Sequence, residues 1–204
     1  MAQVLKEEVR LRILEAAERL FFHEGYKGAT MGLIAEEADV ATGNIYKYFS
    51  NKDELFRTVI TEEFINELYM LTEKRVKTLS AEIMNDVSIK SLEKNRDANN
   101  LLKFWVKNRV KTVILLDRAD GSIYESVRNS YFNMMINESI KGNKVLIENK
   151  MMLFTFKNRL ADTIRGLLDI LTAFEKEKDI KAAFTMSWAY HYAGIRGLLE
   201  SVES

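Results

Sequence analysis

The absence of proline from all 204 residues is the feature that most narrows the fold of this chain. Proline ends helices because its ring removes a backbone N–H and clashes with the preceding turn, so this chain can form helices throughout. Apolar residues recur at helical spacing, as in Ile13, Ala17, Leu20 and Phe21, and no strand-like alternation competes with them. The sequence therefore predicts an all-α protein of about nine helices.

Glycines and polar residues mark the expected ends of these helices. Gly25 is expected to stop the first helix in a left-handed conformation, and Asn51 with Glu54 resembles a capping box. A break is also expected near Ser80. The expected helices cover about 6–23, two short segments within 30–49, and then 53–79, 82–94, 99–117, 122–141, 145–175 and 178–202.

Composition argues against several classes of protein. Without cysteine the chain can form no disulfide, thiolate metal site or cysteine nucleophile. The uncharged run Ala182–Ile195 has 14 residues, against the roughly 20 that a membrane helix needs. The N-terminus lacks the apolar core of a signal peptide. We therefore expect a soluble, cytoplasmic protein that does not enter a membrane, is not an enzyme, and has no metal or cofactor.

The segment 30–49 predicts two short helices joined by a tight turn. Thr30 can cap the first helix with its hydroxyl, and Asp39 tolerates the left-handed conformation that the turn requires. Thr42 can cap the second helix, in which Ile45 and Phe49 point inward. This is the layout of a helix-turn-helix, whose second helix can enter the DNA major groove.

Polar residues of the second short helix form a candidate DNA-reading surface. Gly43 allows close approach to the groove, Asn44 can pair with a base edge, and Lys47 lies one turn further along. Tyrosine hydroxyls and a following lysine can reach phosphates. The candidate DNA-binding residues are Thr30, Ala41, Thr42, Gly43, Asn44, Tyr46, Lys47, Tyr48 and Lys52.

Another interpretation of this segment is an ordinary helical hairpin with solvated polar residues. The net charge of the chain is zero, and residues 1–60 carry eight Lys/Arg against ten Asp/Glu. Overall charge thus argues mildly against nucleic acid. Between Val40 and Lys52, however, there are two lysines and no acidic residue, so any DNA affinity must come from this local face.

The segment from about Arg10 to Phe56 closely resembles the DNA-binding domain of the TetR (tetracycline-repressor-like) family of bacterial transcriptional regulators. It covers about a quarter of the chain, and its densest runs are Gly43–Phe49 and Lys52–Phe56. The other matching residues are Ile13, Ala16, Ala17, Leu20, Phe21, Gly25, Tyr26, Thr30, Ile34, Ala35, Ala38 and Val40.

The resemblance implies a homodimeric, all-α repressor with a helix-turn-helix domain over residues 1–56 and an effector-binding and dimerisation domain over 57–204. Its partners would be double-stranded operator DNA, a second copy bound through the last two helices, and a small apolar or aromatic effector that releases the operator. The alternative is a helical protein-interaction or adaptor module without DNA binding. Such a module would not need Gly43, Asn44 and Lys47 exposed together on one face.

Two residues depart from the family pattern. Asp39 stands where the family usually has glycine, and it places a negative charge near DNA. Ala41 stands where serine is frequent, and it lacks a hydroxyl for a phosphate contact that Thr42 can replace. Both departures concern the backbone contacts with DNA and leave the expected fold unchanged.

The C-terminal region is rich in aromatic residues and methionine, which suit a pocket for an apolar or aromatic effector. At helical spacing, however, a core position is the better expectation for any one of these residues. His191 is expected to hydrogen-bond in the core or a pocket, and Gly194 and Gly197 would allow close helix approach. The candidate pocket residues are Phe104, Trp105, Tyr124, Tyr131, Met135, Met152, Phe156, Trp188 and Tyr192.

Overall fold

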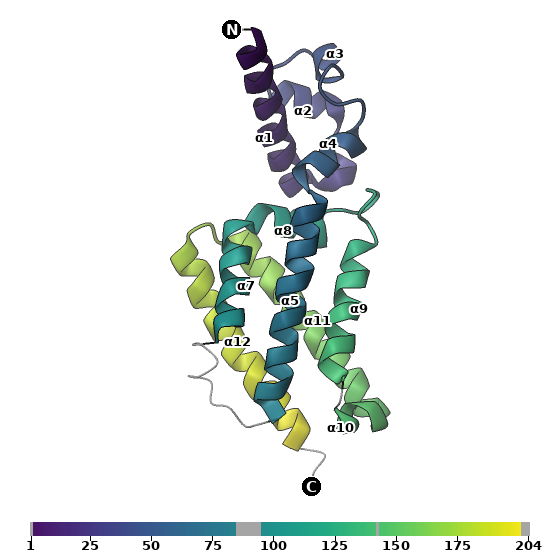
Figure 1. Cartoon of the computed structure of the whole chain (residues 1–204), viewed down its shortest axis with the longest axis vertical. Coiled ribbons are helices and arrows are strands. Elements are labelled where there is room, and N and C mark those ends of the chain that lie inside the picture. The colour runs from purple at the N-terminus through teal and green to yellow at the C-terminus, as the bar shows by residue number, and fades with distance from the viewer. Residues whose placement is uncertain (1, 85–94, 142, 201–204) are drawn as a thin grey trace. The chain divides into compact units, whose positions relative to one another are not determined.

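The computed structural model describes residues 2–84, 95–141 and 143–200, and every regular element in these ranges is a helix (Figure 1). The predicted all-α class is confirmed. The helices are α1 (Ala2–Gly28), α2 (Met31–Glu37), α3 (Thr42–Ile45), α4 (Lys52–Val59), α5 (Glu62–Met84), α7 (Arg96–Lys107), α8 (Arg109–Asp117), α9 (Val127–Ile140), α10 (Lys144–Glu148), α11 (Lys150–Ala173) and α12 (Glu177–Glu200).

The described ranges hold eleven helices, against about nine expected for the whole chain. Polar capping residues divide three of the expected helices in two. The Thr61 hydroxyl accepts from the Phe64 N–H at 3.3 Å where α5 begins. The Asn108 side chain donates to the Phe104 carbonyl at 3.0 Å where α7 ends. Asn149 accepts from the Met151 and Met152 N–H groups at the start of α11.

Two other expectations about the helices have different outcomes. The break predicted near Ser80 is wrong, since α5 continues to Met84. The helix predicted over 82–94 lies outside the described residues from position 85 onward, and so does Gly142 in the expected break before α10. Among the described helices, none is long and apolar enough to cross a membrane.

The chain folds into two compact units. One, which we call the head unit, comprises residues 1–66 and 110–128. The other, the cavity unit, comprises residues 67–109 and 129–204. The head unit thus includes most of α8 and the turns that follow it, in addition to the N-terminal helices.

The core of the head unit is built on one face of α1 and closed by α4. Ile13 and Phe21 of α1 and Phe56 of α4 are fully buried. The Phe56 ring meets the Phe21 ring edge-on with centroids 4.8 Å apart, and it also contacts the rings of Tyr26 and Tyr124. These aromatic contacts fix α4 against α1 and against residues 118–128.

Gly25 produces a kink near the end of α1, with φ at 69° and ψ at 173°. The positive φ predicted here is confirmed. The Tyr26 N–H that follows donates to the Arg118 carbonyl at 2.8 Å, and a Cβ at position 25 would lie 3.5 Å from that carbonyl oxygen. A distance of 3.5 Å is an ordinary contact, so glycine is favoured here by its positive φ and not by a lack of space.

In the cavity unit, α11 and α12 pack against each other, and α12 also contacts α7 (Figure 1). The buried residues of α11, among them Leu160, Ile164, Leu167 and Leu171, recur three or four positions apart and form its packed face. The Arg109 guanidinium donates to the Leu171 carbonyl at 2.9 Å and so satisfies one of the terminal carbonyls of α11.

Candidate functional site

The turn between α2 and α3 takes the conformation that the sequence predicts. Asp39 has φ at 52°, and the Val40 N–H donates to the Ala35 carbonyl at 2.9 Å. The carboxylate of Asp39 is fully exposed and lies 3.8 Å from the Arg12 guanidinium. Arg12 thus offsets part of the negative charge that this residue brings to the candidate DNA-binding surface.

The expected capping of α2 is confirmed, but that of α3 is wrong. The Thr30 hydroxyl accepts from the Leu33 N–H at 3.2 Å. In α3 the capping position belongs to Ala41, which makes no side-chain cap, and Thr42 is already the first helical residue. The α3 helix is only four residues long, since Tyr46 and the residues after it continue as a turn.

The side chains around α3 separate into a buried and an exposed set. Ile45 and Phe49 are buried, so both predicted core positions are confirmed. The Arg10 guanidinium lies 5.6 Å above the Phe49 ring. Seven of the nine candidate DNA-binding residues are exposed, while Tyr48 and Lys52 are half-buried. The exposed seven are Thr30, Ala41, Thr42, Gly43, Asn44, Tyr46 and Lys47.

Lys52 differs from the other candidate phosphate contacts. Its ammonium donates to the carbonyls of Tyr26 and Ala29 at 2.7 and 2.9 Å and lies 4.1 Å from the centre of the Tyr26 ring. Desolvation lowers the pKa of Lys52, while the charge of Asp53 opposes that shift. With two of its three donors held inside the head unit, Lys52 serves to fasten the segment between α1 and α2.

Two further polar contacts hold the start of α4. The Tyr26 hydroxyl donates to the Asp53 carboxylate at 2.5 Å, and burial together with this carboxylate raises the Tyr26 pKa to about 12. Asn51 accepts from the Glu54 N–H at 2.8 Å, as the capping box predicts. The Glu54 carboxylate, however, accepts from the backbone and hydroxyl of Ser50 instead of the Asn51 N–H.

The cavity unit contains a cavity of about 440 Å³ with a mainly apolar wall. Four of the predicted pocket residues line it: Trp105, Tyr131, Met135 and Trp188. Four others are buried elsewhere in the same unit: Phe104, Met152, Phe156 and Tyr192. Tyr124 belongs to the head unit.

Several polar residues of the cavity wall were not among the predicted pocket residues. Thr72, Arg75 and Thr163 lie within helical patterns that predict only which face is buried. The Thr72 hydroxyl lies 2.7 Å from the buried Tyr131 hydroxyl, and burial raises the pKa of Tyr131. Arg75 lies on the otherwise apolar face of α5, and a charged residue in such a position is the one sequence signal that could have predicted a polar cavity wall.

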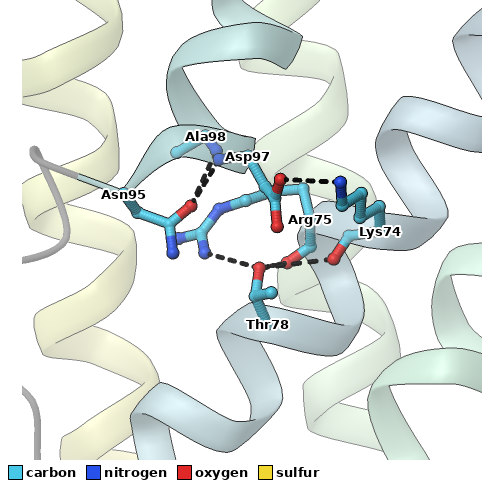
Figure 2. Close-up of polar contacts among 6 residues, drawn as sticks. All are labelled: Lys74, Arg75, Thr78, Asn95, Asp97 and Ala98. Atoms are coloured by element: carbon cyan, nitrogen blue, oxygen red, sulfur yellow. Dashed lines mark hydrogen bonds and ion pairs between the residues drawn. The ribbon is translucent and has the colours of Figure 1, made fainter.

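Figure 2 shows how polar contacts fix α5 beside the start of α7. The Asn95 side chain accepts from the N–H groups of Asp97 and Ala98, which caps α7, and the Lys74 ammonium lies 3.3 Å from Asp97. The Arg75 guanidinium donates to Thr78 at 3.3 Å, and it lies 5.5 Å from the centre of the Trp188 ring. These contacts hold a buried cation at the cavity wall.

His191 on α12 also lines the cavity, which agrees with its expected position in the core or a pocket. Its Nδ1 lies 2.5 Å from the Thr163 hydroxyl of α11, and the imidazole ring lies beside that of Trp188. Burial lowers the His191 pKa to about 4, so the imidazole is neutral at physiological pH.

Helices α11 and α12 also carry large apolar side chains on their surfaces. Met151 and Phe154 of α11 are 80% and 71% exposed, and Met186 and Tyr190 of α12 are 74% and 85% exposed. A Cβ at Gly194 or Gly197 would meet nothing within 4 Å, so no other described residue of the chain approaches these glycines closely.

Comparison with known proteins concerns the N-terminal segment. Residues 13–59 match the family model described as bacterial regulatory proteins, tetR family. The chain is 51% identical over 49 residues to the transcriptional regulator YhgD of Bacillus subtilis, covering 24% of this chain and 26% of that one. It is 49% identical over 51 residues to the regulator HbdR of an Aromatoleum species, covering 25% and 22%.

A third relative, the transcriptional repressor KstR of Rhodococcus jostii, is 41% identical over 59 residues, which are 29% of this chain and 28% of that protein. The chain thus matches about a quarter of the length of these relatives. All of these matched segments are described as parts of helix-turn-helix regulators, and the segment matched by the family model contains α2, the turn and α3. Residues 13–59 of this chain are thus similar to the corresponding segment of the tetR family of bacterial regulatory proteins.

Proposed function

We propose that the protein is a DNA-binding transcriptional regulator, and that it represses transcription until a small apolar or aromatic effector releases it from its operator. The observation that carries the proposal is the joint exposure of Gly43, Asn44 and Lys47 on one surface within the family segment. Asn44 can pair with a base edge, and Lys47 can contact a phosphate. We assign DNA binding to residues 1–56 and the other roles to 57–204, in the cytoplasm.

A homodimer would give such a short reading surface the affinity it needs. We infer that α11 and α12 form the interface with a second copy, since Phe154, Met186 and Tyr190 leave a large apolar surface in contact with water. Exposed Gly194 and Gly197 would let the partner helices approach closely. Two reading surfaces held together would engage two half-sites of a palindromic operator.

The cavity supports the effector role. A mainly apolar space of about 440 Å³ falls within the range that small-molecule sites occupy. In the proposed mechanism, effector binding changes the spacing of the two reading surfaces, so that both half-sites can no longer be bound together. Affinity then falls because the advantage of bivalent binding is lost.

Fluorescence anisotropy with labelled DNA from the intergenic region upstream of the gene tests this proposal. We expect specific binding that unlabelled random DNA does not displace, and a loss of affinity in Asn44→Ala and Lys47→Ala. Lys150→Ala, which changes an exposed lysine of the cavity unit, is the matched control and should bind normally. Absence of specific binding at low salt would instead favour a protein-interaction module.

A further inference from the structure

The residues that line the cavity differ in exposure, and this difference indicates where it opens. Among the described lining residues, Asn99 of α7 and Thr185 of α12 are exposed, and Lys181, one turn before Thr185, is half-buried. All three lie on two helices that contact each other. The cavity therefore reaches solvent between the first turn of α7 and the first half of α12, at a position that we call the rim.

The rest of the wall is mostly buried, and it is largely apolar and aromatic. Its buried residues of this kind are Val76, Leu101, Trp105, Tyr131, Leu160, Ile164 and Leu167. Trp105 meets Phe184 edge-on with ring centroids 5.5 Å apart, and Phe184 stacks with Trp188 at 6.2 Å. Because removal of apolar surface from water is favourable, this wall suits the apolar body of a ligand.

The charges at the rim favour an anion over a cation. The Lys181 ammonium lies 2.5 Å from the Glu177 carboxylate, and this contact, followed by the charge of Lys103 on α7, lowers the pKa of Glu177. Two ammonium groups thus lie near one carboxylate. Asp97 in the first turn of α7 pairs with Lys74 at 3.3 Å. Among the described residues that line the cavity itself, none carries a carboxylate.

The contact between Lys181 and Glu177 leaves Lys181 able to bind a ligand. The two side chains are 42% and 61% exposed, and an exposed ion pair four residues apart on a helix contributes little to stability. An ammonium group also has three hydrogens, so Lys181 can donate to a second acceptor while it keeps Glu177. An anionic group of a ligand at the rim therefore meets a cation whose present contact is weak.

Arg75 is the competing position for an anion, on the buried part of the wall. Its guanidinium donates to Thr78 at 3.3 Å and lies 5.5 Å from the centre of the Trp188 ring. A carboxylate that reached Arg75 would lose its contact with water, which costs free energy even when the charge is paired. A carboxylate bound to Lys181 stays partly hydrated, so the rim is the more favourable position.

We propose that the cavity binds an amphiphilic carboxylate, whose apolar body lies inside the cavity and whose carboxylate accepts from the Lys181 ammonium at the rim. The proposal names the class of effector and rests on the proposed regulatory function. Binding of the effector to the free protein is measured without DNA, so failure of one proposal can be distinguished from failure of the other.

Tryptophan fluorescence measures binding directly, since the chain has two tryptophans and both line the cavity. Purified full-length protein is titrated at neutral pH with decanoate, decanol and decylamine, each below its micelle concentration. The probes share one flexible alkyl chain and differ in charge. We expect decanoate to bind about fivefold more tightly than decanol and about twentyfold more tightly than decylamine, because attraction at the rim is lost in the first case and becomes repulsion in the second.

Three substitutions locate the bound carboxylate. Lys181→Met keeps the length of the side chain but removes its charge, so the preference for decanoate over decanol should disappear. Glu177→Gln removes the competing carboxylate and should strengthen decanoate binding about twofold, which a purely structural role of the pair would not produce. Lys178→Met is the matched control, because this exposed lysine of the same helix is not among the described lining residues, and it should keep the preference.

Salt separates the rim from the buried wall. At about 1 M salt the screening length falls to about 3 Å, so the preference for decanoate should shrink if its carboxylate lies at the partly exposed rim. A preference that survives both high salt and Lys181→Met but is lost in Arg75→Met would place the carboxylate at Arg75 and overturn the proposal.

Two further outcomes would also overturn it. Decanoate binding no tighter than decanol would show that the rim recognises no anion. Failure of all three probes to change the fluorescence of a folded protein would exclude an alkyl chain from the cavity. If decanoate binds as expected but operator binding is absent, the cavity chemistry stands and the regulatory proposal fails.

Discussion

In the head unit, polar side chains near the core form hydrogen bonds within the unit, whereas in the cavity unit several polar side chains line an open space. Tyr26 donates to Asp53, and Lys52 donates to two carbonyls of its own unit. In the cavity unit, Arg75 and His191 lie at the wall of a 440 Å³ cavity. Apolar surface shows the same contrast, since Tyr190 is 85% exposed while Phe56 is fully buried.

This contrast suggests which unit requires another molecule for its stability. The head unit buries its aromatic core within itself, and its residues around α3 are exposed. The cavity unit leaves both an internal space and an apolar helix surface unfilled. We therefore expect substitutions in the head core to act on folding, and those on the surface of α12 to act on association.

The largest effect is expected from Phe56→Ala. This ring has no exposed surface and contacts the rings of Phe21, Tyr26 and Tyr124. Its loss should lower the free energy of unfolding by about 4 kcal/mol, because a cavity forms where the α1 and α4 helices meet. Urea denaturation followed by circular dichroism measures this change. Tyr46→Ala, at an exposed aromatic residue of the same unit, should cost less than about 1 kcal/mol.

The next largest effect concerns association of the cavity unit. Met186→Arg with Tyr190→Arg places two charges on the exposed apolar surface of α12. If this surface is buried against a second copy, the dimer should be weakened by about 3 kcal/mol or more, which raises its Kd at least a hundredfold. Sedimentation velocity across a concentration series detects the shift to monomer. An unchanged dimer would place the interface elsewhere.

A third prediction separates two lysines that the sequence treats alike. Lys52→Met should lower the free energy of unfolding by about 2 kcal/mol, since a charged donor to the Tyr26 and Ala29 carbonyls is lost. Lys47→Ala, at an exposed site, should leave stability unchanged and reduce the salt dependence of DNA binding by about one phosphate contact. Equal stability of the two variants would refute the structural role of Lys52.

Lys47 and Lys52 also illustrate how much the sequence could predict. Helical periodicity was sufficient for the all-α class, the buried positions Ile45 and Phe49, and the exposed residues around α3. It could not show that Lys52 folds back on a loop, because that contact joins residues 26 positions apart. Nor could helical periodicity show the ends of α4, α7 and α10, because the apolar pattern continues across them. Single side chains such as Asn108 and Asn149 decide where one helix ends and the next begins.

The cavity was harder to predict for a similar reason. Trp105 and Phe104 are adjacent and both buried, yet only Trp105 lines the cavity. Periodicity predicts which face of a helix is buried, but packing of several helices decides whether a buried side chain meets another side chain or an open space. The polar wall residues Arg75 and Thr163 were missed because each lies alone in an otherwise ordinary helical pattern.

The smallest effect is expected from Tyr26→Phe. It removes one hydrogen bond to Asp53 while keeping the ring among Phe21 and Phe56, so the free energy of unfolding should fall by about 1 kcal/mol at neutral pH.

The folded protein raises the Tyr26 pKa from 10 to about 12. This group therefore stabilises the fold fully below pH 10, and the contribution is lost as the pH rises from 10 through 12. Part of the alkaline loss of stability should accordingly disappear in the variant. Urea denaturation at several pH values measures both effects, with Tyr46→Phe as the control, because Tyr46 is an exposed tyrosine of the same unit. An alkaline profile identical to that of the unmodified protein would show that the Tyr26–Asp53 contact contributes nothing to holding α1 against α4.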